Sequence, residues 1–172
     1  ALPDLRRVLV VGSGGREHAL SWALQRDNAI ETVGITPGNA GSDQQALAIG
    51  ETDSTALIAH CRTHSVDLVV VGPEAPLAAG VADDLRQAGI AVFGPGAEGA
   101  QLEASKAWAK QLMQEAGVPT AGHWAVTSEA DALAVLAEVG RPLVVKADGL
   151  AAGKGVTVAD TIEQAEQAIR EA

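Results

Sequence analysis

The sequence has few aromatic residues and a single cysteine. Besides histidine, its only aromatic side chains are Phe93 and three tryptophans among 172 residues, so Ala, Val, Leu and Ile must build any core. The lone Cys61 excludes an internal disulfide and a cysteine-based zinc site. A chain without disulfides is typical of a reducing compartment, and we therefore expect a cytoplasmic protein.

Basic residues are also scarce. The chain has 12 Lys and Arg against 22 Asp and Glu, which gives a formal net charge of −10. A field of that sign disfavours nucleic acid and anionic membrane surfaces, so we expect neither as a partner, although a small anion can still bind at a locally positive site. No apolar run approaches the roughly 18 residues of a membrane span, and the first residues lack a signal-peptide pattern.

Short apolar runs alternate regularly with helical segments over the first hundred residues. We expect strands at 8–11, 32–36, 46–49, 67–71 and 90–93, and helices at 15–26, 54–64 and 76–88. Short loops join them. The pattern is typical of an α/β fold with an open parallel sheet and helices on both faces.

The regular alternation of strands and helices changes near Gly117. A long helix at 98–116, broken near Ser105, precedes strands at 123–126, 142–146 and 155–158 and helices at 128–139 and 161–172. Thr161 and Gln164 are spaced as a capping box for the last helix. We expect two domains, 1–117 and 118–172. The second has too few strands for a core of its own, so we expect the protein to continue beyond residue 172.

Glycine- and proline-rich loops follow four of the expected strands, at 12–15, 37–41, 72–76 and 94–96. Ligands of open α/β sheets bind beyond the carboxyl ends of the strands, where these loops would meet. The sequence therefore predicts a binding site at this edge of the sheet.

The first loop leads into a helix. Loop and helix start together have the sequence Gly-Ser-Gly-Gly-Arg-Glu-His-Ala, which begins at Gly12. Its glycines would let the backbone approach an anion at the helix N-terminus. The alternative is a dinucleotide-binding fingerprint, but Glu17 stands where the third glycine would fall. The second strand ends at Thr36 without the acid that binds a ribose hydroxyl. A nicotinamide oxidoreductase is therefore disfavoured.

Two further motifs each have a functional and an ordinary explanation. Residues 37–41, Pro-Gly-Asn-Ala-Gly, can offer backbone N–H groups to an anion or can form a simple turn. Glu74, between Pro73 and Pro76, can bind a sugar hydroxyl or an amine, or can only complement the dipole of a helix start.

The fourth motif starts at Lys146, at the end of an apolar strand, and continues in a loop with three glycines and a second lysine, Lys154. Two cations and a backbone-rich loop suit a polyphosphate. The motif is not a Walker loop, because Gly155 and a strand follow where that loop has Ser or Thr and a helix. The alternative is a solvated surface loop.

Other notable side chains favour ordinary explanations. His60 and His64 lie one helical turn apart but lack a third metal ligand, so we expect a solvated helix face. Cys61 fits a small packed residue better than a nucleophile. We expect Trp22 and Trp108 in the core or in an interface.

The motifs together resemble the phosphoribosylamine–glycine ligase family. Gly-Ser-Gly-Gly-Arg-Glu-His-Ala, Pro-Gly-Asn-Ala-Gly, Gly-Pro-Glu-Ala-Pro-Leu, Phe-Gly-Pro and Lys-Ala-Asp-Gly-Leu-Ala-Ala-Gly-Lys-Gly-Val occur in that order, and the resemblance covers essentially the whole chain. It implies a pre-ATP-grasp domain followed by part of an ATP-grasp domain. It also implies ATP-dependent ligation of glycine to 5-phosphoribosylamine through glycyl phosphate, with ATP and Mg²⁺ or Mn²⁺ as cofactors.

The resemblance also implies site residues. The phosphoribosylamine cradle would contain Gly14, Gly15, Arg16, Glu17 and His18, with walls from Pro37, Gly38, Asn39, Ala40, Gly41, Gly72, Pro73, Glu74, Pro76 and Leu77. The nucleotide would meet Lys106, Lys146, Gly149, Gly153, Lys154 and Gly155. No catalytic residue or metal ligand is assigned. The family's magnesium ligands and adenine hinge would lie beyond residue 172, so we expect the chain as given to be catalytically incomplete.

Alternatives remain open beside this resemblance. Another ATP-grasp ligase or carboxylase would lack Arg16-Glu17-His18 in combination with the 37–41 motif. A non-catalytic nucleotide-binding fragment is the other alternative. The stretch 42–49 is shorter than the resemblance leads us to expect. The sequence does not determine the oligomeric state, with a monomer favoured.

Overall fold

The computed structural model describes residues 5–42, 46–150 and 155–172. The chain divides into two compact units, Ala1–Gln101 and Leu102–Ala172. Each unit is described by itself. The predicted domain boundary near residue 117 stays a prediction.

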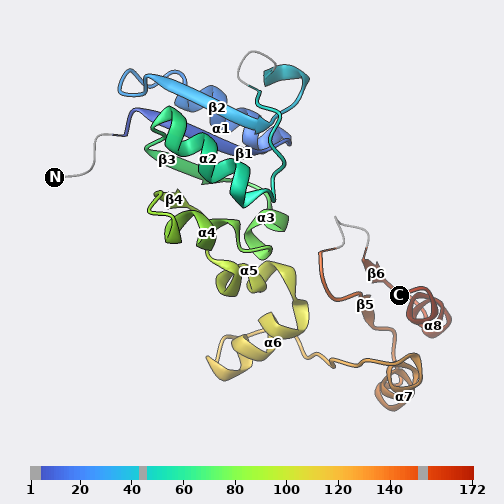
Figure 1. Ribbon diagram of the computed structural model, residues 1–172. Coiled ribbons are helices and arrows are strands. Elements are labelled where there is room, and N and C mark those ends of the chain that lie inside the picture. The colour runs from blue at the N-terminus through green and yellow to red at the C-terminus, as the bar shows by residue number, and fades with distance from the viewer. Residues whose placement is uncertain (1–4, 43–45, 151–154) are drawn as a thin grey trace. The chain divides into compact units, whose positions relative to one another are not determined.

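The first unit is built on a parallel sheet of four strands in the order β2-β1-β3-β4 (Figure 1). The strands are β1 (Arg7–Gly12), β2 (Thr32–Pro37), β3 (Leu68–Val71) and β4 (Val92–Phe93). Val10 of β1 lies opposite Ile35 of β2 on one side and Val70 of β3 on the other. The predicted parallel sheet is confirmed. Because the chain leaves β1 first toward β2 and later toward β3, the strand order reverses between β1 and β3.

Both faces of the sheet are buried. Leu9 and Val11 of β1 belong to one apolar cluster, and Val8 and Val10 belong to the other, because successive strand residues point to opposite faces. Helix α1 (Gly15–Leu24) adds Leu24 to the cluster of Val8 and Val10. Full burial of a leucine such as Leu9 contributes about 1.5–3 kcal/mol relative to exposure.

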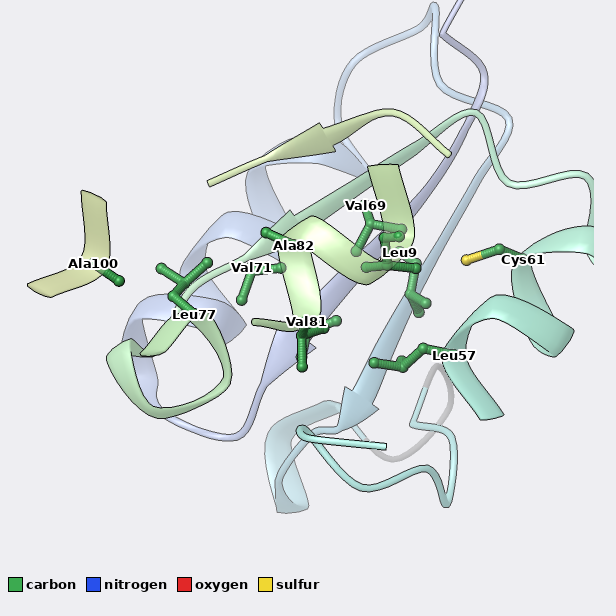
Figure 2. Packing of buried hydrophobic residues seen from close by; sticks show 11 residues of the cluster. Leu9, Leu57, Cys61, Val69, Val71, Leu77, Val81, Ala82 and Ala100 are labelled. Carbon is green, nitrogen blue, oxygen red and sulfur yellow. The ribbon is translucent and has the colours of Figure 1, made fainter. Parts of the chain in front are cut away.

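The opposite face carries helix α2 (Ser54–His64), with Leu57 and Cys61 packed toward Leu9 (Figure 2). Cys61 is buried, and burial raises the pKa of its thiol to about 11. The interpretation of Cys61 as a packed residue is therefore confirmed. The imidazoles of His60 and His64, on the same helix, stack on each other with ring centroids 4.1 Å apart.

The helix predicted at 76–88 is two helices, α3 (Glu74–Ala78) and α4 (Val81–Gln87). Gly80 separates them with a φ of +88°. This left-handed conformation interrupts the helix, and glycine adopts it without steric cost. The prediction missed the break because a single glycine inside a helical pattern is ordinarily tolerated.

The strand predicted at 46–49 is not formed. Ala46 makes only an isolated bridge with Ile35. Thr36 of β2 supplies the remaining links through its side chain, because its Oγ1 lies 3.0 Å from the Leu47 carbonyl oxygen and 2.6 Å from that of Ile49. A hydroxyl thus replaces part of a strand's hydrogen-bond ladder.

Helix α5 (Ala97–Ala104) buries Ala100 in the first core, and helix α6 (Lys106–Glu115) follows it. The predicted break near Ser105 is confirmed. Ser105 is extended, with a φ of −129°, and its Oγ accepts a hydrogen bond of 3.1 Å from the Trp108 N–H. The serine therefore ends one helix and caps the next.

The second unit pairs a short antiparallel hairpin with helices. Its elements after α6 are α7 (Glu129–Val139), β5 (Val144–Lys146), β6 (Val156–Val158) and α8 (Ile162–Glu171). Thr161 caps α8 by accepting from the Gln164 N–H at 3.2 Å. Gln164 Oε1 accepts from the Asp160 N–H at 2.8 Å, one residue before the position a capping box would use.

One expectation for the remaining segments is wrong. Residues 123–126 form no strand, and none of the described strands pairs with them. Trp22 is 55% exposed on α1, where the Arg26 guanidinium lies over its ring at 4.5 Å from the centroid, so Trp22 is not a core residue and its place in an interface stays a prediction. Within the described ranges, no helix has both the length and the apolar character to cross a membrane.

Candidate functional site

Four loops leave the same edge of the first unit's sheet, because all four strands are parallel. The predicted convergence of the loops at 12–15, 37–41, 72–76 and 94–96 is therefore confirmed. The strand order reverses between β1 and β3, and a crevice at such a reversal is where open α/β sheets bind ligands.

The loop after β1 leads into the N-terminus of α1, and Glu17 fastens it. Glu17 is only 3% exposed. Its Oε2 accepts a hydrogen bond of 2.9 Å from the Gly14 N–H, which satisfies one backbone donor at the helix start. Gly15, the first helical residue, has open space where a side chain would begin. The exposed backbone at Gly15 is thus free for an anion.

Arg16 links the loops after β1 and β3. Its Nε donates to Glu17 Oε1 at 2.7 Å, and its Nη1 donates to Glu74 Oε1 at 3.2 Å. The hydrogen bond to Glu17 raises the pKa of Arg16 above its usual range. The Glu74 backbone N–H, and then Arg16, lower the pKa of Glu74, so this carboxylate stays ionised at neutral pH. We call these three residues the acid–arginine cluster.

The loop after β2 is tied to the loop after β1 through Asn39. Its Nδ2 donates to the Ser13 carbonyl oxygen at 3.0 Å, and its Oδ1 accepts from the Gly41 N–H at 2.9 Å. The ring of His18 packs on Gly41 so closely that a Cβ there would overlap it. These contacts bring His18 and the 37–41 loop together, as the sequence predicted. Pro37 and Ala40 lie exposed in the same stretch.

The Gly72–Leu77 motif divides between site and core. Glu74 remains 43% exposed and faces Arg16. Pro76 and Leu77 are buried instead, and Leu77 lies in the core cluster of Leu9. These two residues, predicted as walls of the site, therefore pack beneath the loop and do not face a ligand.

The loop after β4 is held by two residues that sequence reasoning missed. Asp83 Oδ2 accepts from the Ala97 N–H at 2.7 Å, at the start of α5, and an Arg86 Nη2 N–H donates to the Gly94 carbonyl oxygen. Both side chains come from α4, where they read in the sequence as ordinary surface charges. Only their proximity to 94–97 in the fold gives them this role.

In the second unit, Asp148 organises the start of α6. Its Oδ1 accepts from the Lys106 N–H at 2.6 Å, and its Oδ2 accepts from Ser105 Oγ at 3.0 Å. Burial opposes ionisation, but these hydrogen bonds outweigh it and hold the pKa of Asp148 below its usual range. Lys106 Nζ donates to the Gly149 carbonyl oxygen at 2.9 Å. The sequence placed Lys106 and Gly149 in one site but did not identify Asp148.

The hairpin places the other predicted nucleotide residues. Lys146 ends β5 with an exposed side chain, opposite Val156 of β6. The Ala147 N–H donates to the Gly155 carbonyl oxygen at 2.8 Å, so the hairpin extends one step past the strands. Gly153 and Lys154 lie outside the described residues. Among the described residues, the two cations Lys106 and Lys146 suit the phosphates of a nucleotide.

Comparison with known protein families matches both units. Residues 6–103 match the family model described as phosphoribosylglycinamide synthetase, N domain, and residues 104–172 match its ATP-grasp (A) domain. The fold is shared with a solved biotin carboxylase–β,γ-ATP complex from Campylobacter jejuni, at 20% identity and TM-score 0.69, over 94% of this chain and 40% of that one. By class, then, the chain carries an ATP-grasp fold behind an α/β N-terminal domain.

Within that class, the chain belongs to the phosphoribosylglycinamide synthetase family. It is 53% identical over 95% of its length to a phosphoribosylamine–glycine ligase of Nostoc, and 50% identical over 96% to that of Escherichia coli K12. A crystal structure of the Thermotoga maritima phosphoribosylamine–glycine ligase matches at 31% identity and TM-score 0.74, over 94% of this chain and 38% of that one. The chain spans 39% of the length of these two curated relatives.

Proposed function

We propose that the complete protein ligates glycine to 5-phosphoribosylamine at the expense of ATP. The observation that carries the proposal is the match of both units to one family, with relatives of that activity about 50% identical across the chain. ATP phosphorylates the glycine carboxylate and leaves as ADP. The amine of phosphoribosylamine then attacks glycyl phosphate, phosphate leaves, and glycinamide ribonucleotide forms.

The phosphoribosylamine site is assigned to the edge of the first unit's sheet. The exposed backbone N–H of Gly15 lies at the start of a helix, where the dipole favours a phosphate. Arg16 adds a fixed positive charge. Glu74 is ionised and partly exposed, so it can accept from a ribose hydroxyl or from the substrate amine. The 37–41 loop and His18 close the remaining side.

The nucleotide site is assigned to the second unit. Lys106, Lys146 and the 149–155 loop, including Gly153 and Lys154, would hold the phosphates of ATP. When bound, ATP supplies the phosphoryl group and Mg²⁺ or Mn²⁺ neutralises its charge, while the lysines position the transferring phosphate. No metal ligand is assigned within these residues. The partners are thus small molecules, and we place the protein in the cytoplasm.

The test follows ADP formation by the full-length protein with ATP, Mg²⁺, glycine and freshly generated 5-phosphoribosylamine. Omitting each component in turn should abolish ADP formation. ADP that depends on a different acid or amine would reject this substrate pair and support another ATP-grasp ligase or carboxylase. A folded protein that binds ATP but forms no ADP would support a non-catalytic nucleotide-binding protein.

A further inference from the structure

A charged side chain is buried at the carboxyl ends of β1 and β3. Glu17, at the third position of α1, is 3% exposed, whereas carboxylates are almost never fully buried unless they are paired. Both of its oxygens are engaged within the protein. Oε2 accepts from the Gly14 N–H and Oε1 accepts from Arg16 Nε. A substrate group would have to displace one of these donors to reach the carboxylate.

Glycines from the ends of β1 and β3 and the loops that follow them surround this carboxylate. A Cβ added at Gly12 would overlap Glu17 Cγ, one at Gly72 would overlap Oε1, and one at Gly14 would lie 2.8 Å from Oε2. Gly15 differs, because a Cβ there would meet no atom within 4 Å. Three glycines of two sequence motifs are therefore required by Glu17, while Gly15 is the one that leaves backbone open to a ligand.

The buried carboxylate fixes both the loop after β1 and one exposed cation. It accepts from the Gly14 N–H at the start of α1, and it orients the Arg16 guanidinium, whose other end reaches Glu74. Arg16 itself stays 54% exposed and thus accessible. A charge-assisted hydrogen bond to a buried group is stronger and more directional than one at the surface.

We infer that Glu17 is a positioning residue of the phosphoribosylamine site: it binds no substrate, but it fixes Arg16 and the loop after β1. The identity of the substrate rests on the proposed function. The packing of Glu17 between glycines does not, so the two can fail separately.

The functional test is Glu17→Gln in the full-length protein. Gly14 and Arg16 donate to different oxygens of the carboxylate, so an amide of the same size would turn its NH2 group, itself a donor, toward one of them. We expect at least a tenfold higher KM for phosphoribosylamine and a matching increase in the Kd of glycinamide ribonucleotide by calorimetry. The KM values for ATP and glycine should stay within twofold. Glu31→Gln is the matched control, because Glu31 is an exposed ion-pair partner of Arg6.

An unchanged KM for phosphoribosylamine in Glu17→Gln would overturn the inference. So would an equal loss for all three substrates, which indicates only partial unfolding. A wild-type protein without ligase activity would reject the proposed function instead, and the packing test below would still decide whether Glu17 shapes the loop.

The packing test combines Gly72→Ala with Glu17→Ala. In the wild-type background, the new methyl group should lower the Tm and raise the KM for phosphoribosylamine, because it displaces Glu17. In the Glu17→Ala background, the same substitution should lower the Tm no further. Equal lowering in both backgrounds would contradict the assignment, since the two positions would then act independently.

Discussion

The two units achieve order in different ways. The first buries both faces of a four-stranded sheet and ties its loops together with side chains from neighbouring segments, such as Asn39 to Ser13. The second has a two-stranded hairpin whose paired Val144 and Val158 are 50% and 71% exposed. The residues assigned to phosphoribosylamine thus lie on loops that follow a sheet buried on both faces. Those assigned to the nucleotide depend on a few local contacts.

The largest effect should come from a cavity in the first unit. Leu9→Ala removes a fully buried side chain and should lower the free energy of unfolding by about 2–5 kcal/mol. Val144→Ala, at a half-exposed hairpin position, should cost less than about 1 kcal/mol. Urea denaturation of the full-length protein, with hydrogen exchange to locate the loss, measures both. Similar costs at the two positions would remove the contrast between the units.

An intermediate effect should follow from Asp148→Ala in the second unit. The substitution removes the carboxylate that accepts from the first N–H groups of α6, beside the Ser105 cap, at a cost of about 1–2 kcal/mol in local stability. Amide exchange at Lys106 and Ala107 should accelerate, and the KM for ATP should rise.

The same contact predicts a pH dependence. Because the pKa of Asp148 is lowered in the folded protein, its contribution is present above the unfolded value near about 4 and is lost on further acidification. Asp148→Asn should remove most of that acid sensitivity while keeping part of the cap. Unchanged exchange at α6 in both variants would show that the carboxylate does not organise this segment.

The smallest effect should come from Gly15→Ala. No atom obstructs the new methyl group, and alanine favours a helix over glycine, so the free energy of unfolding should rise by about 0.5–1 kcal/mol. The KM for phosphoribosylamine should rise at the same time, because the methyl group would cover backbone assigned to the phosphate. Thermal unfolding and initial rates test the two parts. A destabilisation like that expected for Gly72→Ala would contradict the assignment of space around Gly15.

Local patterns predicted most of the architecture. The apolar runs gave the four parallel strands, and Ser105 and Thr161 marked helix starts because a hydroxyl accepts from the backbone three residues on. The failures arose where a single residue opposed the pattern. Gly80 interrupted a helix, and residues 123–126 had strand-like composition but none of the described strands pairs with them.

The location of the candidate site was predictable from the sequence, but the hydrogen bonds between its side chains were not. The loop motifs identified Arg16, Glu17 and Glu74 as site residues, yet no sequence pattern distinguishes a carboxylate that binds substrate from one that is buried against glycines. Asp83 and Asp148 were missed because their hydrogen-bond partners are 14 and 42 residues away along the chain. Such contacts depend on the fold and leave no short-range signal.

The hydroxyl of Thr36 bears on how this family can tolerate insertions. The Thr36 hydroxyl and one isolated bridge at Ile35, rather than a ladder of paired strands, anchor the segment that contains Leu47 and Ile49. A change of length ahead of that segment would shift no strand pair of the sheet, whereas Thr36→Val would remove the hydroxyl's links while keeping the shape of the side chain. A loop here can therefore lengthen or shorten during evolution at little cost, provided that the hydroxyl stays.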